Sequence, residues 1–228
     1  MVSEQHARQR DARGFTFIEV LVVMAIIAVL AGLTVAGLGL MNRKRPEIET
    51  RTRLQKLAAA TNAWHQRFRR WPPSDARKIQ KVAGGSKSIK SMPNDVNAGI
   101  ESLVQALYWE TSGVDPQLGD KDLGNTDDDE LSEGGVTVQG PKLWEVVDGW
   151  GNPFVYFVHT EYAEYTQNPP TYVSYPVDAG GMEEDVQPKP WKLEAEGSSG
   201  YAQAQSFQIF SMGPDGVPNT RDDLKAWE

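Results

Sequence analysis

The chain has 228 residues, a formal net charge of −8 and no cysteine. The lack of cysteine excludes disulfides, thiolate nucleophiles and zinc–thiolate sites. The acidic balance argues against nucleic acid as the main partner, because phosphate binding needs a basic patch. The three histidines are His6, His65 and His159, so a histidine metal site or a hydrolytic triad has few candidate side chains.

Residues 15–41 form an apolar run that contains one charged residue, Glu19. The run exceeds the roughly 18 to 20 residues needed to cross about 30 Å of hydrocarbon, and it therefore predicts a membrane-spanning helix. An acid inside a span requires a partner or a function. If the chain were cut after Gly14, the new amine on Phe15 and the positive end of the helix would both favour an anion at Glu19. Between parallel helices, such a pair would set the register of assembly.

The helix is predicted to continue beyond the membrane over residues 42–70. Glu47 and Arg51 form a helix-supporting pair four residues apart. Apolar and small residues then recur at steps of three and four, at Leu54, Leu57, Thr61, Trp64 and Phe68. We expect the helix to loosen near Pro46 and to end at Trp71-Pro72-Pro73, since proline lacks an amide proton. Trp64 and Phe68 are predicted to pack in the core.

Residues 71–228 are predicted to form one globular domain. Asn97 is expected to cap a short helix whose apolar face comprises Ile100, Leu103, Val104, Leu107 and Tyr108. The stretch from 115 to 133 then concentrates acids at Asp120, Asp122, Asp127, Asp128, Asp129 and Glu130. Their spacing does not fit an EF-hand loop, and the run is typical of a solvated insert.

Strand-like segments follow at 143–148, 154–158, 172–177 and 207–212. The first two flank the turn Gly149-Trp150-Gly151-Asn152-Pro153, and this arrangement favours a hairpin. Residues 178–200 are predicted to be a polar loop. A long helix followed by a few short strands predicts an α+β fold with a small, mostly antiparallel sheet.

The segment Gly14-Phe15-Thr16-Phe17-Ile18-Glu19 resembles the prepilin processing site of type IV pilins and secretion pseudopilins. The resemblance implies that a membrane-embedded prepilin peptidase cleaves after Gly14 and methylates the Phe15 amine. It also implies a helical filament in which Glu19 neutralises the N-terminus of a neighbouring copy.

Four further segments resemble the major pseudopilin of type II secretion and stand in the order expected of it. They are 71–73 (WPP), 99–104 (GIESLV), 148–156 (DGWGNPFVY) and 207–224. The resemblance implies a pilin-like fold with a calcium-binding loop near its C-terminus. The implied calcium ligands are the carboxylates of Asp215, Asp222 and Asp223 and the carbonyls of Met212 and Val217. The residues alone favour a metal-free Asp-Gly turn.

The expected organisation is a leader at 1–14, a span at 15–41, a periplasmic continuation of the helix at 42–70 and a globular domain at 71–228. Insert loops are expected near 111–140 and 160–205. The positive charges flanking the apolar run do not orient it, because they lie on both sides. The resemblance implies a single-pass inner-membrane protein whose leader is cytoplasmic and whose domain is periplasmic.

The predicted function is structural and not enzymatic. The protein is expected to polymerise with copies of itself as a major pseudopilin, with prepilin peptidase, the inner-membrane assembly platform and minor pseudopilins as further partners. The first alternative is a type IV pilus or minor pilin subunit for adhesion, motility or DNA uptake. The second is a membrane-anchored enzyme or ligand-binding domain, with His159 and Glu161 as the candidate catalytic pair, although a lone histidine at a strand end is more often structural.

Overall fold

The computed structural model describes residues 16–131, 134–135, 141–177, 180–193 and 200–228, and for residues 33–43 it describes only the helical backbone. The chain divides into two compact units, 1–44 and 45–228, and each is described by itself. The predicted leader at 1–14 lies outside the described residues, and so does Phe15.

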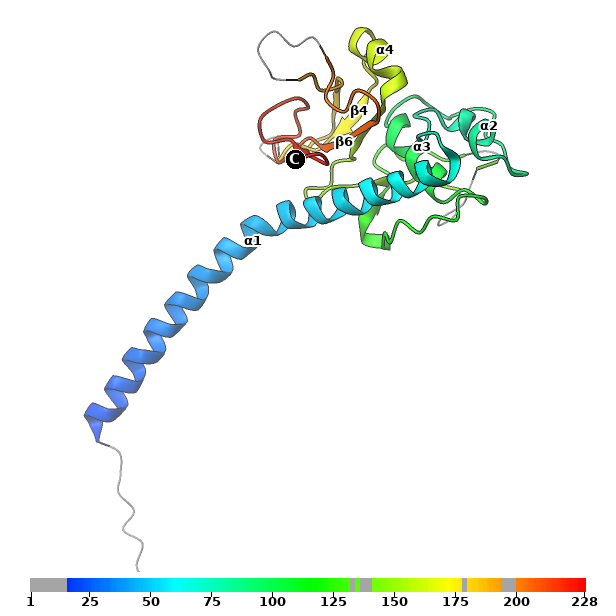
Figure 1. Cartoon of the computed structure of the whole chain (residues 1–228). Coiled ribbons are helices and arrows are strands. Elements are labelled where there is room, and N and C mark those ends of the chain that lie inside the picture. Colours follow the sequence, from blue (N-terminus) through cyan, green and yellow to red (C-terminus); the bar gives the residue numbers. More distant parts are fainter. Residues whose placement is uncertain (1–15, 132–133, 136–140, 178–179, 194–199) are drawn as a thin grey trace, which may run out of the picture. The chain divides into compact units, whose positions relative to one another are not determined.

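The first unit contains the start of α1 (Phe17–Phe68), the long helix of Figure 1. All side chains from 16 to 32 are exposed, including large apolar ones such as Phe17 and Met24. A helix that is apolar on every side normally lies inside protein or lipid. These side chains are thus left for contacts that the chain itself does not supply.

Within the described part of the chain, no helix combines the length and the mean hydropathy expected of a membrane span. The end of the predicted span, from 33 to 41, lies among residues whose side chains are not described. The span at 15–41 therefore stays a prediction.

In the second unit, α1 contributes one side to the core through Leu54, Leu57, Ala60 and Trp64, all of them buried. The predicted core position of Trp64 is confirmed, and Phe68 is partly buried against the same core. The helix ends at Phe68, two residues before the predicted end, because Arg69 adopts a left-handed backbone with φ of 55°. This conformation terminates a helix.

Short helices surround the core. They are η1 (Ala76–Lys78), α2 (Ile79–Ala83), α3 (Ala98–Leu107), η2 (Asp120–Asp122), η3 (His159–Glu161) and α4 (Tyr162–Gln167). The predicted apolar face of α3 is confirmed, since Ile100, Leu103, Val104 and Leu107 are fully buried. Asn97 occupies the predicted N-cap position of α3, with φ of 52°, but its side chain does not cap the helix. Its amide oxygen instead accepts a bond from the Val173 amide at 3.0 Å.

Within the described residues, the strands form three small antiparallel sheets. The largest joins β3 (Val155–Val158), β6 (Phe207–Ser211) and β7 (Leu224–Lys225), with Val155 opposite Phe210. The other two pair β1 (Leu123–Gly124) with β2 (Glu145–Val146), and β4 (Tyr172–Ser174) with β5 (Glu184–Val186). The expected α+β fold, a long helix with a small antiparallel sheet, is confirmed.

The strand prediction is only partly correct. The predicted hairpin between 143–148 and 154–158 is limited to the antiparallel bridge between Val147 and Pro153, because β2 and β3 belong to different sheets. The sequence predicts a loop at residues 178–200. Part of this segment instead forms β5, which pairs with β4 in an antiparallel arrangement.

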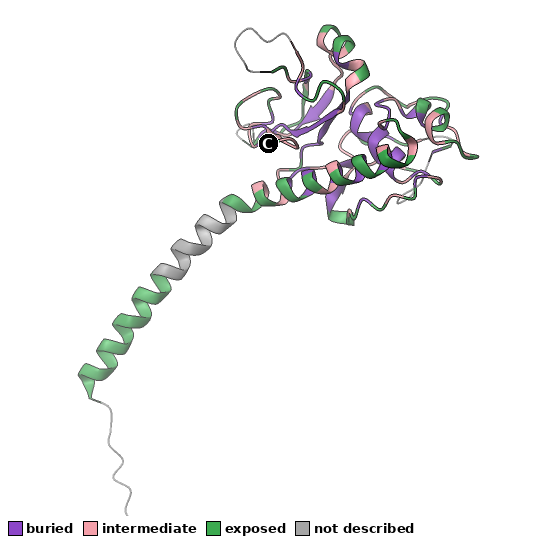
Figure 2. Ribbon diagram, in the orientation of Figure 1, coloured by how far each residue is buried: buried purple, intermediate pink, exposed green. Residues whose placement is uncertain are grey.

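Buried residues are concentrated in α3, β3, β6 and one side of α1 in the second unit (Figure 2). Within this unit, α3 contacts both β2 and β3. The helix therefore connects two of the sheets through one core.

The predicted solvated insert is only partly solvated. Asp122 is 4% exposed and Asp129 is 7% exposed, and the Arg53 Nε donates to Asp122 Oδ1 at 2.8 Å. The prediction fails for these acids because a basic residue on α1, far away in sequence, pairs with one of them. Parts of both expected inserts, at 132–133, 136–140, 178–179 and 194–199, lie outside the described residues.

Candidate functional site

Glu19 lies in the first turn of α1 and forms a reciprocal contact with Thr16. The Thr16 amide and hydroxyl donate to Glu19 Oε2 at 2.7 and 2.8 Å, and the Glu19 amide donates to the Thr16 hydroxyl at 3.3 Å. This arrangement is a capping box, which satisfies amide groups that have no partner at the start of a helix.

The capping box adds Thr16 to the predicted assembly residues. The sequence prediction assigned Glu19 and overlooked Thr16, although Thr-x-x-Glu before an apolar run is a recognisable signature of a helix start. Both side-chain bonds use the same carboxylate oxygen, and Glu19 is exposed. The other oxygen thus remains for a partner outside the chain. Gly14 and Phe15 lie outside the described residues.

The predicted calcium ligands follow β6. The hydroxyl of Thr220 lies 2.6 Å from Asp222 Oδ1, 3.2 Å from Asp223 Oδ1 and 3.4 Å from Asp215 Oδ2. A hydroxyl has a single proton to donate. It can therefore fully satisfy only one of the three carboxylates that converge on it.

Backbone contacts fix the same loop. The Val217 amide donates to Asp215 Oδ1 at 2.8 Å, and the Asn219 amide donates to Asp223 Oδ2 at 2.8 Å. The Val217 carbonyl lies 3.2 Å from the Thr220 hydroxyl, so it faces the same group. Met212 is fully buried, and a role for its carbonyl stays a prediction.

Electrostatics in this loop favour a cation. Asp223 is 3% exposed, and burial raises its pKa to about 7. Burial, assisted by Asp222, also raises the pKa of Asp215. An all-oxygen donor set of carboxylates and carbonyls suits Ca²⁺. The three carboxylates do not bring one oxygen each within 4.8 Å of the others. The residues fit the ion in type, although the loop is more open than a closed site.

A buried turn supports the start of the loop. Asp148 Oδ1 accepts bonds from the Trp150 and Asn152 amides at 2.9 and 3.0 Å, and the Asn152 side chain donates to the Gly213 carbonyl at 3.4 Å. Burial raises the pKa of Asp148 to about 6. The turn between β2 and β3 thereby holds the residues just after β6.

The other two segments of the expected ordered set also meet in the core. The Tyr156 hydroxyl donates to the Pro72 carbonyl at 2.6 Å, and the Ser102 hydroxyl donates to the Pro73 carbonyl at 2.6 Å. The prolines after α1 are therefore bonded to both β3 and α3. Four segments that are distant in sequence form one connected network.

His159 and Glu161 are not joined as a catalytic pair. His159 Nδ1 lies 3.1 Å from the Ser206 carbonyl, and Glu161 forms an ion pair with Lys78 at 3.2 Å. Each side chain thus has a structural partner of its own.

Residues 9–35 match the family model described as the prokaryotic N-terminal methylation motif. The match includes Gly14, Phe15, Thr16 and Glu19, and it indicates a type IV pilin-like subunit that is processed by a prepilin peptidase and assembles into pilus-like filaments. The α+β fold is consistent with this indication. No curated protein and no solved structure shows significant similarity to the chain.

Proposed function

We propose that the chain is the major pseudopilin of a type II secretion system, polymerising through its N-terminal helix into a short periplasmic filament that promotes protein export across the outer membrane. The observation that carries the proposal is the methylation motif at 9–35, which places Glu19 in the first turn of an exposed, apolar helix.

Each part of the motif has a physical role in this proposal. Cleavage after Gly14 frees the Phe15 amine, and Glu19 of one copy pairs with the amine of its neighbour. In a low-dielectric surrounding, such a pair is much stronger than in water, and an unpaired charge is strongly disfavoured. The exposed apolar side chains of 17–30 would then be buried against membrane lipid before assembly and against other copies afterwards.

The connected network in the second unit supports a pseudopilin. The segments at 71–73, 99–104, 148–156 and 207–224 occur in the order of the resemblance, and hydrogen bonds of 2.5 to 3.4 Å join them. The proposed location is the inner membrane, with the leader in the cytoplasm and the second unit in the periplasm, where it would meet minor pseudopilins and the assembly platform.

Calcium is the proposed cofactor of the C-terminal loop. Asp215, Asp222 and Asp223 would hold the ion, with the carbonyls of Val217 and Met212. Its charge would neutralise three converging carboxylates and fix the loop after β6.

A type IV pilus or minor pilin subunit is the second candidate. The observation in its favour is the additional structure inserted into the domain, namely η2 with β1, and α4 with β4 and β5. β4 is buried, whereas α4 and β5 carry exposed residues. These exposed residues would add surface to the compact pseudopilin pattern, and an enlarged surface suits an adhesive or terminal subunit.

The test is co-expression of the full chain with a prepilin peptidase and a type II assembly platform. Intact mass and N-terminal sequencing should show a mature chain that starts at methylated Phe15. Electron microscopy should show filaments that Glu19→Ala abolishes, and export of a reporter should depend on them. An uncut leader would refute a pilin-like subunit. Cleavage and filaments without any effect on export would favour the pilus alternative.

A further inference from the structure

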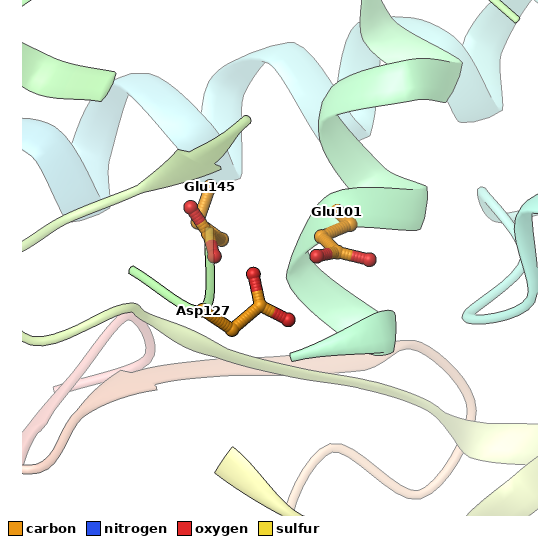
Figure 3. Close-up of side chains that lie close together, drawn as sticks. All are labelled: Glu101, Asp127 and Glu145. Carbon is orange, nitrogen blue, oxygen red and sulfur yellow. The ribbon is translucent and has the colours of Figure 1, made fainter. Parts of the chain in front are cut away.

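Three acidic side chains from separate elements meet inside the second unit (Figure 3). Glu101 comes from α3, Asp127 from the segment after β1, and Glu145 from β2. One carboxylate oxygen of each lies within 4.8 Å of the others. This acid cluster is separate from the C-terminal loop and shares no residue with it.

The carboxyl group of Glu101 has no hydrogen-bond partner. Its relative exposure is 0%, and both of its carboxylate oxygens are buried and unpaired. Figure 3 shows its side chain directed from α3 toward Asp127 and Glu145. A buried carboxyl without a partner is strongly unfavourable whether it carries a charge or a proton. The Glu101 carboxyl therefore requires a hydrogen-bond donor or a cation that the described residues do not provide.

Two neighbouring acids also have a carboxylate oxygen without a hydrogen-bond partner. Asp127 Oδ1 and Asp129 Oδ1 are also buried and without a hydrogen-bond partner. Among the described residues, no lysine, arginine or histidine forms an ion pair with Glu101, Asp127, Asp129 or Glu145. Burial, followed by the charges of its acidic neighbours, raises the pKa of Glu101 well above its ordinary value.

The surrounding polar groups hold the carboxylates in place. Glu145 Oε1 accepts bonds from the Asn97 side chain at 3.0 Å and from the Thr126 hydroxyl at 3.1 Å. Asp127 Oδ2 accepts a bond from the Asn94 side chain at 2.9 Å. These donors leave Asp127 Oδ1 and both Glu101 oxygens for another partner. Fixed outer partners of this kind orient the ligands of metal sites.

We propose that Glu101, Asp127 and Glu145 bind a divalent cation, with calcium preferred, as a second metal site of this protein. The donors are all carboxylate oxygens, which suit a hard cation and not zinc or copper. Two oxygens bound to one Ca²⁺ at about 2.3 to 2.6 Å are at most about 5 Å apart, which agrees with the spacing of the cluster. The ion attaches the acidic segment at 123–131 to α3 and β2.

The experiment isolates this site in the full-length chain by removing the loop acids with Asp215→Asn and Asp223→Asn. Calcium bound to the purified protein is counted by equilibrium dialysis and elemental analysis. We expect about one ion per chain in this background, and at least a tenfold weaker affinity after Glu101→Gln is added. The matched control is Asp128→Asn, in the same segment but with a side chain 92% exposed, which should leave the count unchanged.

A second readout uses thermal unfolding of the same variants. In chelator, Glu101→Gln should raise the Tm, because the amide carries no charge and can donate hydrogen bonds to the neighbouring carboxylates. Added calcium should raise the Tm of the chain that carries only Asp215→Asn and Asp223→Asn, and it should not raise the Tm once Glu101→Gln is added. If Glu101→Gln does not fold, the half-buried Asp127→Asn carries the same test. A background chain that binds no calcium, or one whose affinity Glu101→Gln leaves unchanged, would overturn the proposal, and neither result depends on filament assembly.

Discussion

The Ser211 hydroxyl donates a 2.5 Å hydrogen bond to Oδ2 of Asp148. Both residues are buried, at 0% and 2% exposure. The bond joins the end of β6 to the turn between β2 and β3, and Asn152 of the same turn reaches Gly213 immediately beyond. The C-terminal acidic loop therefore starts from a position fixed by a single buried carboxyl.

The raised pKa of Asp148 should make the stability of the second unit depend on pH. Burial raises its pKa from 3.8 to about 6 in the folded chain. Because the folded value is the higher one, its contribution to stability is fully present below about pH 4 and is lost as the pH rises to about 6. The difference corresponds to about 3 kcal/mol. Asp148→Asn keeps an acceptor for the Trp150 and Asn152 amides and should remove this dependence.

The measurement is urea unfolding of wild type and Asp148→Asn at pH 4 and pH 7. The wild type should lose about 2 to 3 kcal/mol relative to the variant between these values. If the difference in stability between the two proteins stays constant with pH, the raised pKa of Asp148 is disproved.

Replacing Arg53 with alanine should destabilise the second unit by about 1.5 to 3 kcal/mol, because Asp122 loses its buried hydrogen bond from Arg53 and retains the longer ion pair with Lys56 at 3.7 Å. Arg53→Ala combined with Asp122→Ala should recover part of the loss. Arg51→Ala is the matched control, since its pair with Glu47 is half exposed, and it should cost less than about 1 kcal/mol. Chemical unfolding of the four proteins gives the comparison. Equal losses for Arg51 and Arg53 would contradict the structure.

The helix cap and the charge of Glu19 can be separated by two substitutions. Glu19→Gln retains a capping box, since glutamine also serves at that position, but it loses the countercharge for a neighbouring amine. Thr16→Ala weakens the cap by about 0.5 to 2 kcal/mol and keeps the charge. We expect filaments to be lost in Glu19→Gln and reduced in number in Thr16→Ala, as counted by electron microscopy. Normal assembly of Glu19→Gln would show that the cap, and not the charge, is what assembly requires.

Calcium removal should destabilise the C-terminal loop. In a chain carrying Glu101→Gln, calcium at a hundredfold excess over its Kd should add about 2.7 kcal/mol to the free energy of unfolding. Asp215→Asn with Asp223→Asn should remove this gain, whereas Asp185→Asn, exposed on β5, should not. Thermal unfolding with calcium and with chelator measures the effect. The loop assignment fails if calcium stabilises the chain with and without the two loop acids equally.

Gly149 should not tolerate a side chain. An added Cβ would collide with the backbone of Pro46, and the Gly149 amide donates to the Thr50 hydroxyl at 2.8 Å. Moving the Gly149 backbone away from Pro46 would break its hydrogen bond to Thr50. Gly149→Ala should therefore lower the free energy of unfolding by about 1 to 3 kcal/mol. Gly151→Ala is a comparison in the same turn, where no atom lies within 4 Å of the added Cβ but φ is +96°. A smaller loss for Gly149 than for Gly151 would argue against the close approach.

Local signals account for the parts of the fold that the sequence predicted. The periodicity of α1 and the apolar face of α3 depend on residues three and four apart. Trp71-Pro72-Pro73 predicted the end of α1 to within two residues for the same local reason. The capping-box spacing of Thr16 and Glu19 is also a local signal for the start of α1, although the sequence prediction overlooked it. In each case the interacting residues are neighbours in sequence.

Long-range pairing accounts for what the sequence did not predict. A run of acids is typical of a solvated surface, yet Asp122 is buried because Arg53 reaches it from α1, 69 residues away. Glu101 lies on a helix whose apolar face was predicted correctly, but its acidic neighbours come from two later segments. No local pattern contains these contacts.

The contacts of Arg53 also have a mechanical consequence. Its guanidinium forms hydrogen bonds with one carboxylate and three backbone carbonyls, at Asp122, Lys121, Val147 and Asp148. Because all of these bonds start from one side chain, a displacement of Arg53 would strain them together. Movement of this part of α1 would therefore be transmitted at once to η2 and to the turn that follows β2.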